Sequence, residues 1–230
     1  MQYGCVVPAV FLSRPNRFIA RVRLGEQTVE CHVKNTGRCR ELLVPGATVY
    51  LERGTNPNRR TAWDLIAADK GGKLINMDAQ APNRVFEEWA RGGGFLPELS
   101  LLRPETTYRN SRFDFYVETK NQKILVEVKG VTLEEDGVVR FPDAPSERAV
   151  KHVQELKKAR KAGYEAYVLF VIQMKGVRYF TPNRQTHPEF AEALQEAADA
   201  GVKILARDCV VTTDSMTLAD EVPVVLGQPE

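Results

Sequence analysis

The sequence predicts an α/β protein, α+β overall, in which a small β-barrel precedes a second domain with a mixed central sheet. Residues 5–80 hold short stretches of alternating apolar and polar residues between turn residues, with no strong helical segment. After residue 82, helical spacing appears and alternates with further strands. The charge balance also changes there: residues 1–82 carry 12 Lys and Arg against 7 Asp and Glu, and residues 83–230 carry 20 against 23. We therefore predict two domains, 1–82 and 83–230.

Five strands are expected in the first domain. They are "FIARVRL", "QTVECHV", "ATVYLE", "AWDLIAAD" and "KLINMD". A closed or partly open barrel buries such strands without leaving free edges. The five-stranded oligonucleotide-binding (OB) barrel is the version that we favour.

The second domain is expected to alternate helices with strands. Asn83 is a plausible helix start, and the glycines after residue 91 stop that helix. The remaining elements are a strand around "RPETTYR", a hairpin over 111–130, a loop through "EEDGVVRFPDAPSE", a helix over about 145–162 ending at Gly163, the buried strand "EAYVLFVIQM", a helix over about 188–200 and a last strand "VKILARD".

The hairpin "SRFDFYVETKNQKILVEVKG" carries three ionisable groups among apolar residues. Phe113, Phe115 and Val117 alternate with polar residues and predict one hydrophobic face. If Asn121 and Gln122 form the loop, Asp114 lies opposite Lys129 and diagonal to Glu127, on the other face. Diagonal neighbours are roughly 7–8 Å apart, so their side chains can converge on one ion. A slip of one residue would reverse this arrangement.

Two carboxylates beside an ammonium group suit phosphodiester hydrolysis. Mg²⁺ or Mn²⁺ would take oxygen ligands from Asp114 and Glu127 and keep several waters. Such a metal lowers the pKa of a bound water and neutralises charge on the phosphate, while Lys129 stabilises the developing charge. The alternative is a surface salt bridge between Lys129 and either acid.

The acid followed by Glu-x-Lys on the next strand resembles the PD-(D/E)xK nuclease-like superfamily. More specifically, nearly the whole chain resembles the sugar fermentation stimulation protein (SfsA) family. The matching segments are "RPNRFIARV", "HVKNTGRCRELLVPG", "APNRV", "SRFDF", "VEVKGVTL", "FPDAPSERAVKHVQEL" and "GVKILA". The resemblance implies an OB-fold-like first domain, a PD-(D/E)xK nuclease-like α/β second domain, and DNA binding.

The resemblance also implies roles for individual residues. Asp114 and Glu127 resemble the metal ligands and Lys129 the catalytic lysine of such sites. Glu105 and Glu88 resemble acids that support the site, with solvated charges as the alternative. Asp143 follows the Glu-x-Lys motif, so Pro142-Asp143 is not the "PD" of the superfamily name, and Asp143 is instead a candidate helix cap.

The helix expected over 145–162 carries a polar stripe. Arg148, Lys151, His152 and Glu155 lie at helical spacing on one face. A solvated face is the usual meaning of such a stripe. In the nuclease-like fold this helix flanks the active site, which makes Lys151 and His152 candidates to hold a phosphate or the nucleophile.

The basic first domain supplies the candidate phosphate contacts. They are Arg17, Lys34, Asn35, Arg38, Arg40, Arg59 and Arg60. Phe18, Tyr50 and Trp63 are candidates to stack on bases, with a place in the core as the alternative.

These observations leave three functions open. The first is a metal-dependent deoxyribonuclease that holds DNA with its barrel. The second is a non-catalytic, regulatory DNA-binding protein with a vestigial nuclease site. RNA is a third ligand to consider, because oligonucleotide-binding barrels serve both polymers. DNA binding is common to the first two, and the oligomeric state stays open.

The composition is that of a globular protein with no membrane-spanning segment. The chain is 43% hydrophobic and 27% charged, and no apolar run reaches the length needed to cross a bilayer. The N-terminus lacks a basic leader. Cys5, Cys31, Cys39 and Cys209 show no C-x-x-C spacing, so we expect free thiols in a reducing cytoplasm.

Overall fold

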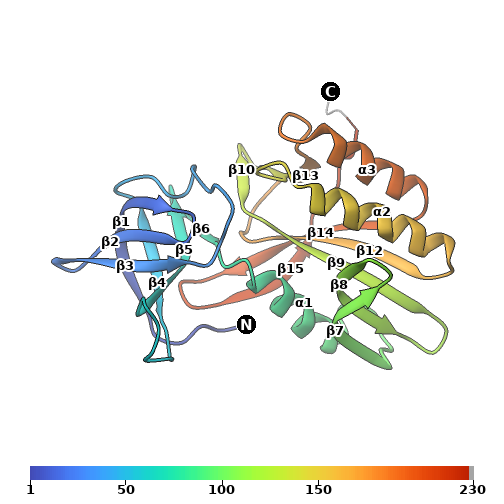
Figure 1. Ribbon diagram of the computed structural model, residues 1–230, viewed down its shortest axis with the longest axis horizontal. Coiled ribbons are helices and arrows are strands. Elements are labelled where there is room, and N and C mark those ends of the chain that lie inside the picture. Colours follow the sequence, from blue (N-terminus) through green and yellow to red (C-terminus); the bar gives the residue numbers. More distant parts are fainter. Residues whose placement is uncertain (228–230) are drawn as a thin grey trace.

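The computed structural model describes residues 1–227 and consists of a β-barrel joined to a larger α/β domain with a mixed sheet (Figure 1). This confirms the predicted fold class. Within the described residues no helix is long and apolar enough to cross a membrane. All four cysteines are free thiols, of which Cys5 is exposed and the other three are buried.

The barrel is built from β1 to β5. The strands are β1 (Val6–Asn16), β2 (Ile19–Leu24), β3 (Gln27–Val33), β4 (Thr48–Arg53), β5 (Trp63–Lys70) and β6 (Lys73–Asn76). Their order is β3-β2-β1-β4-β5-β6, and a parallel pairing of β3 with β5 closes the first five strands into a barrel. All five expected strands exist. The last of them, β6, pairs with β5 in antiparallel at the end of the strand order and is not one of the five strands that close the barrel. The expected set lacked β1, because Pro8 and Pro15 interrupt its pattern.

The second domain has a six-stranded sheet with helices on both faces. Its helices are α1 (Ala81–Arg91), α2 (Glu147–Lys161) and α3 (Pro188–Asp199), and its main strands are β7 (Leu101–Tyr108), β8 (Ser111–Glu118), β9 (Lys123–Val131), β12 (Glu165–Ile172), β14 (Lys203–Val211) and β15 (Met216–Glu221). The order is β15-β14-β12-β9-β8-β7, with β9, β12 and β14 parallel and the other pairs antiparallel.

Each helix packs its apolar side chains against one face of the sheet, α1 on one face and α2 and α3 on the other. Phe86 of α1 shares a core with alternate residues of β12, such as Leu169, and Val153 of α2 shares the other core with Phe170. Strand β12 is therefore buried on both faces, as its apolar run predicted. Figure 1 shows α1 below the sheet and α2 and α3 above it.

The helix boundaries follow the predicted signals closely. Helix α1 begins two residues before Asn83, with a proline in its first turn. Helix α2 ends just before Gly163, whose φ of 89° is the left-handed conformation that favours glycine after a helix.

The segment predicted as a loop over 134–147 contains a hairpin, so that prediction was wrong. Strands β10 (Leu133–Glu135) and β11 (Val138–Phe141) pair around Asp136-Gly137, and β13 (Tyr179–Pro182) joins β11 in parallel. Both turn residues have positive φ. An Asp-Gly pair is a sequence signal for the turn of such a hairpin. Strand "VKILARD" is also not the last one, because β15 follows it.

A buried polar network joins the barrel to the second domain. Gln173, at the end of β12, donates to the Asn76 side chain (3.0 Å) and to the Asp78 carbonyl (3.1 Å). The Asn76 amide in turn donates to the Tyr3 hydroxyl (2.8 Å). These groups are all buried. Because each has a partner, the network fixes the position of the barrel on the second domain.

Candidate functional site

The structure places Glu127 and Lys129 of β9, Asp114 of β8 and His152 of α2 in one region of the second domain. Glu127 is 2% exposed, and its Oε1 is hydrogen-bonded to both the Lys129 ammonium and His152 Nδ1. The side chain of Lys129 is 16% exposed. The alternative of a solvent-exposed ion pair is therefore wrong for this lysine.

The hairpin register differs from the predicted one by two residues. Phe115 pairs with Val126 and Glu118 with Lys123, and a four-residue turn over 119–122 joins the strands. The paired ladder ends at Phe115 and Val126, and beyond it the Val128 backbone N–H donates to the Asp114 side chain. The two acids still lie close enough for the negative charge of Glu127 to act on Asp114.

The predicted apolar face of β8 is interrupted at Asp114. Phe113 packs in the core under α2, whereas Phe115 and Val117 pack in the core under α1. The regular alternation is thus broken between Phe113 and Phe115. Asp114 therefore meets α1 on one side while staying close to Glu127.

Asp114 is held by two hydrogen bonds that use one oxygen each. The Asn83 side chain, in the first turn of α1, donates to Oδ1 (3.0 Å), and the Val128 backbone N–H donates to Oδ2 (2.8 Å). Burial and the negative charge of Glu127 raise the pKa of Asp114. Sequence reasoning gave Asn83 no role in the site, because only its position at a helix start was visible.

Glu127 has the opposite electrostatic balance. Burial acts to raise its pKa, but the hydrogen bonds of His152 and Lys129 and the positive charge of Lys129 outweigh burial, so the pKa of Glu127 is lowered. Its second oxygen, Oε2, is buried and has no hydrogen-bond partner among the described residues. A buried carboxylate oxygen without a donor is costly unless a cation occupies the space beside it.

The two carboxylates fit a hard divalent cation. Asp114 and Glu127 are negatively charged oxygen donors, and Mg²⁺ usually binds one or two carboxylates and completes its shell with water and phosphate. The described residues contain no group of three or more His, Cys, Asp or Glu side chains placed to hold a metal. The site therefore offers two protein carboxylates.

Gly130, directly after Lys129, allows α1 and the interdomain network to approach β9. A Cβ at this position would lie 2.5 Å from the Gln173 side-chain oxygen and 2.8 Å from a ring carbon of Pro82. Any larger residue would therefore push α1 or Gln173 away from the strand that carries Glu127 and Lys129.

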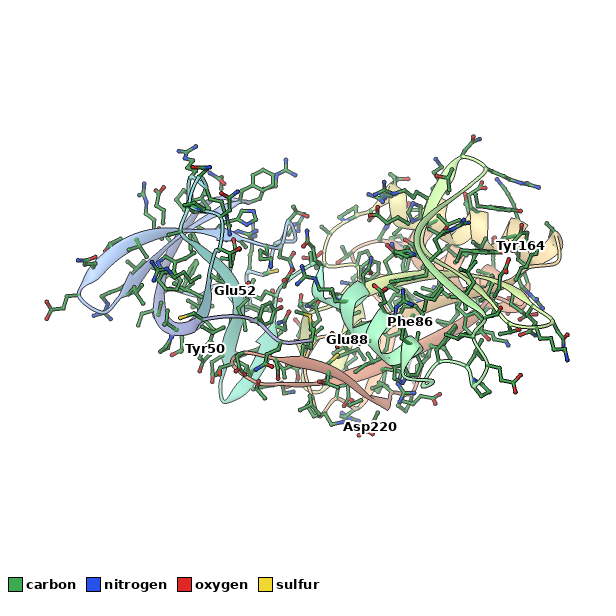
Figure 2. The ribbon with its side chains drawn as sticks, turned by 90° about the horizontal axis from the view of Figure 1, so that it is seen from below. Tyr50, Glu52, Phe86, Glu88, Tyr164 and Asp220 are labelled. Carbon is green, nitrogen blue, oxygen red and sulfur yellow. The ribbon has the colours of Figure 1, made fainter. Side chains whose placement is uncertain are left out.

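Three other candidate residues are placed elsewhere. Glu88 is exposed on α1, which Figure 2 views from below, and accepts a hydrogen bond from the Met1 amino group. Glu105 is 66% exposed and pairs with Arg112 (3.0 Å). Lys151 donates to the Asn110 carbonyl (2.9 Å). Of the polar stripe on α2, His152 is the residue that reaches the acids.

The candidate phosphate contacts of the barrel fall into two groups. The exposed ones are Arg17, Arg38, Arg40 and Arg60. The other three have partners within the protein: Lys34 pairs with the buried Asp78 (2.7 Å), Arg59 forms a two-point contact with Asp64, and Asn35 bonds the Met77 carbonyl and the Gly37 N–H.

Arg14, which sequence reasoning did not single out, organises the loop over 35–38. Its guanidinium group donates to the carbonyls of Arg17, Asn35, Gly37 and Arg38 at 2.7–2.8 Å. Five fixed donors make arginine suited to holding several carbonyls at once.

Asp143 does not cap α2. Its carboxylate accepts the backbone N–H of Arg38 (2.9 Å), whereas Ser146 accepts the N–H of Ala149 and caps the helix. Asp143 thus joins the barrel loop to the second domain.

Among the aromatic candidates, only Phe18 presents a large exposed surface. Its side chain is 48% exposed, and the Arg17 guanidinium lies over its ring at 5.4 Å. Trp63 and Tyr50 are partly buried against hydrophobic cores. Phe18 is therefore the best placed of the three to stack on a base.

Comparisons with known proteins match both parts of the chain. A family model described as "SfsA N-terminal OB domain" matches residues 12–77, and one described as "Sugar fermentation stimulation protein RE domain" matches residues 80–215. The chain is 58% identical to a sugar fermentation stimulation protein homolog of Desulfitobacterium hafniense over 226 residues, which cover 98% of this chain and 99% of the relative.

A Clostridium beijerinckii homolog is 53% identical, with 98% of this chain and 100% of the relative covered. A solved structure of Pyrococcus furiosus SfsA in complex with Ca²⁺ is similar over 98% of both chains, with 29% sequence identity and a TM-score of 0.89.

Proposed function

The chain belongs to the sugar fermentation stimulation protein (SfsA) family, and from this premise we propose that it binds DNA and hydrolyses phosphodiester bonds with Mg²⁺ or Mn²⁺. The observation that carries the proposal is the state of Glu127. One of its oxygens is bound by Lys129 and His152, and the other is buried without a partner beside Asp114.

Divalent cation binding is supported from two directions. The buried carboxylate of Glu127 and the partly buried carboxylate of Asp114 lie close enough for Glu127 to shift the pKa of Asp114, and a cation between them would relieve both the repulsion and the unpaired oxygen. The similar Pyrococcus furiosus protein is described in complex with Ca²⁺, which shares with Mg²⁺ a preference for oxygen ligands.

The protein side chains would divide the work around a bound phosphate. A bound metal ion would lower the pKa of a water and neutralise phosphate charge. Lys129 would place its ammonium at the charge that develops on the phosphate oxygens. His152 would hold Glu127 in orientation, and Asn83 would do the same for Asp114.

DNA binding is supported by the exposed arginines of the barrel. Arg17, Arg38, Arg40 and Arg60 are exposed on a domain with excess positive charge, and such side chains form phosphate contacts. These contacts carry no sequence information. We therefore expect binding with little sequence preference.

A non-catalytic DNA-binding protein is the second candidate. Two observations favour it: the described residues provide no third metal-ligating side chain at the site, and the Lys129 ammonium is already bound to Glu127. In this alternative the site binds a phosphate of the DNA without cleaving the DNA strand.

Metal titration of purified variants tests the proposal. We expect wild type to bind Mn²⁺, and Asp114→Asn and Glu127→Gln to bind it at least tenfold more weakly, because a neutral amide is a poorer ligand for a hard cation. Glu105→Gln is the matched control, since it removes an acid of the same domain whose side chain pairs with Arg112. Calorimetry gives the affinities.

Cleavage assays on single-stranded, duplex and branched DNA then separate the two candidates. Metal-dependent cleavage that Lys129→Ala and Asp114→Asn abolish, and that Glu105→Gln retains, supports the nuclease. Metal binding without cleavage of any substrate supports the non-catalytic protein. Equal Mn²⁺ affinity in all variants would remove the metal site from the proposal.

A further inference from the structure

Two neighbouring clefts of the molecule share part of their lining, and together we call them the groove. The first, of about 420 Å³, lies on the barrel and is lined by residues that include Phe18, Lys34 and Arg59. The second, of about 290 Å³, lies between the barrel and the second domain and is lined by residues that include Gly130 and Asp143. Asn35, Thr36 and Ala79 line both clefts.

From this geometry we infer that the groove binds a single strand of DNA, with one base stacked on Phe18 and the chain led toward Lys129. The inference rests on the proposed function and adds the form of the DNA that the protein takes. It assigns to Phe18 and to the loop over 35–38 the role of guiding an unpaired strand.

The size of the clefts favours a single strand over a duplex. Volumes of roughly 300–1,000 Å³ hold one small ligand, so each cleft has room for about one nucleotide. A duplex keeps its bases stacked inside and cannot place one of them in such a cleft, whereas a single strand can turn its bases outward onto a protein surface.

Phe18 has the properties of a stacking platform. The residue is 48% exposed, and its backbone is fixed at both ends: its N–H donates to the Asn16 side chain (2.9 Å) and its carbonyl accepts the Val33 N–H (2.8 Å). The Arg17 guanidinium lies over the ring. An aromatic ring on a rigid backbone loses little freedom when a base stacks on it.

The path from Phe18 to the acids is preorganised. Arg14 holds four carbonyls at and beside the 35–38 loop, and Asp143 holds the Arg38 N–H, so the segment where the clefts meet is rigid. Two carboxylates line the groove: both oxygens of Asp64 are bound by Arg59, and one oxygen of Asp143 accepts the Arg38 N–H. Gly130 at the far end directly follows Lys129. Asp114, Glu127 and Lys129 line neither cleft, so a strand in the groove would have to extend past Gly130 to reach them.

Binding assays with the full chain in EDTA test the inference. The probes are a labelled 12-nucleotide DNA strand, the same strand in a duplex, and an RNA strand of the same sequence, measured by fluorescence anisotropy at one salt concentration. We expect the single DNA strand to bind at least tenfold more tightly than the duplex. Phe18→Ala should weaken single-strand binding about tenfold, since stacking contributes on that scale.

Three further variants make the result specific. Phe18→Trp should restore single-strand affinity, because it keeps a stacking ring. Thr36→Trp should weaken single-strand binding by filling the junction of the two clefts. Val44→Ala is the matched control: Val44 is 49% exposed on the same barrel and lines neither cleft, so its removal should change nothing.

The outcomes separate this inference from the proposed function. Equal affinity for strand and duplex, unchanged by Phe18→Ala, would overturn the groove and leave DNA binding standing. Failure to bind either DNA would overturn DNA binding itself. A tenfold preference for the RNA strand would overturn the assignment of DNA as the ligand.

Discussion

At the scale of single residues, a positive charge in the basic domain did not by itself identify a phosphate contact. Lys34 and Arg60 have the same charge and the same predicted role. The structure places Arg60 at the surface and Lys34 against Asp78, which is fully buried. Because a buried carboxylate needs a compensating charge, Lys34 is part of the framework that joins the domains.

Lys34→Met should therefore destabilise the protein. The substitution keeps the length of the side chain and leaves Asp78 buried without its cation, which typically costs about 3–5 kcal/mol of the free energy of unfolding. Arg60→Met is the control and should stay within about 0.5 kcal/mol of wild type, as surface substitutions usually do. Urea unfolding of both variants measures the difference. Equal stabilities would show that Lys34 is not a structural cation.

At the scale of elements, two hairpins link the chemistry to the architecture. The β8–β9 hairpin brings Asp114 alongside Glu127, and the β10–β11 hairpin fastens the second domain to the barrel. Glu134 of β10 accepts hydrogen bonds from Lys70 (2.9 Å) and Lys73 (3.2 Å) on the barrel and from the Gly137 N–H (2.7 Å). Burial acts to raise the pKa of Glu134, but these donors outweigh burial and lower it to about 2.

The contacts of Glu134 with Lys70, Lys73 and Gly137, which we call the clamp, should make the free energy of unfolding depend on pH in a defined window. The pKa of Glu134 is lower in the folded state than in the unfolded state, where it is near 4.5, so its stabilisation is present above pH 4.5 and is lost as the pH falls toward 2. Glu134→Gln should cost about 2 kcal/mol at pH 7, the scale of hydrogen bonds to a charged group.

Urea unfolding of wild type and Glu134→Gln between pH 7 and pH 2.5 measures this effect. The difference between the two proteins should shrink steadily below pH 4.5. Glu196→Gln is the control: its pair with Lys157 also lowers the pKa of the acid, but the pair is exposed, so its removal should change the pH profile far less than Glu134→Gln does. A difference that is the same at every pH would mean that the charge of Glu134 is not what stabilises the clamp.

At the scale of the whole molecule, the two domains carry charges of opposite sign. The barrel segment carries the excess of Lys and Arg, and the remainder is mildly acidic. Such an arrangement orients a polyanion toward the barrel and its exposed arginines. The cleft lined by Gly130 and Asp143 lies at the boundary between the domains, and Asp114 and Glu127 lie in the second domain.

DNA binding should accordingly weaken strongly with salt. The logarithm of the affinity falls with the logarithm of the salt concentration by roughly 0.9 for each duplex phosphate contact and 0.7 for each single-strand contact. Arg38→Gln combined with Arg40→Gln should reduce this slope by about 1–2 and weaken binding to unrelated sequences equally. Lys120→Gln with Lys123→Gln, in and beside the β8–β9 turn, is the matched control. A slope near zero for wild type would contradict a phosphate-driven interaction.

The sequence by itself determined the fold class and the family, and it predicted that Glu127 and Lys129 share one face of their strand. Periodicity sets which residues of a strand share a face, and helix stop signals are local, so these features are visible without coordinates. A local signal was also present for the hairpin at Asp136-Gly137, a segment predicted as a loop.

Only the tertiary structure decided which charged side chains pair with another residue of the protein and which face the solvent. Lys34 pairs with Asp78, which is distant in the sequence, and Arg59 pairs with Asp64. Glu105 pairs with Arg112 on the neighbouring strand. Asn83 reaches Asp114 across 31 positions of the sequence. The groove exists because a loop of the barrel meets the second domain. These are contacts between segments that no local pattern records, so the packing of the two domains had to be known before they could be assigned.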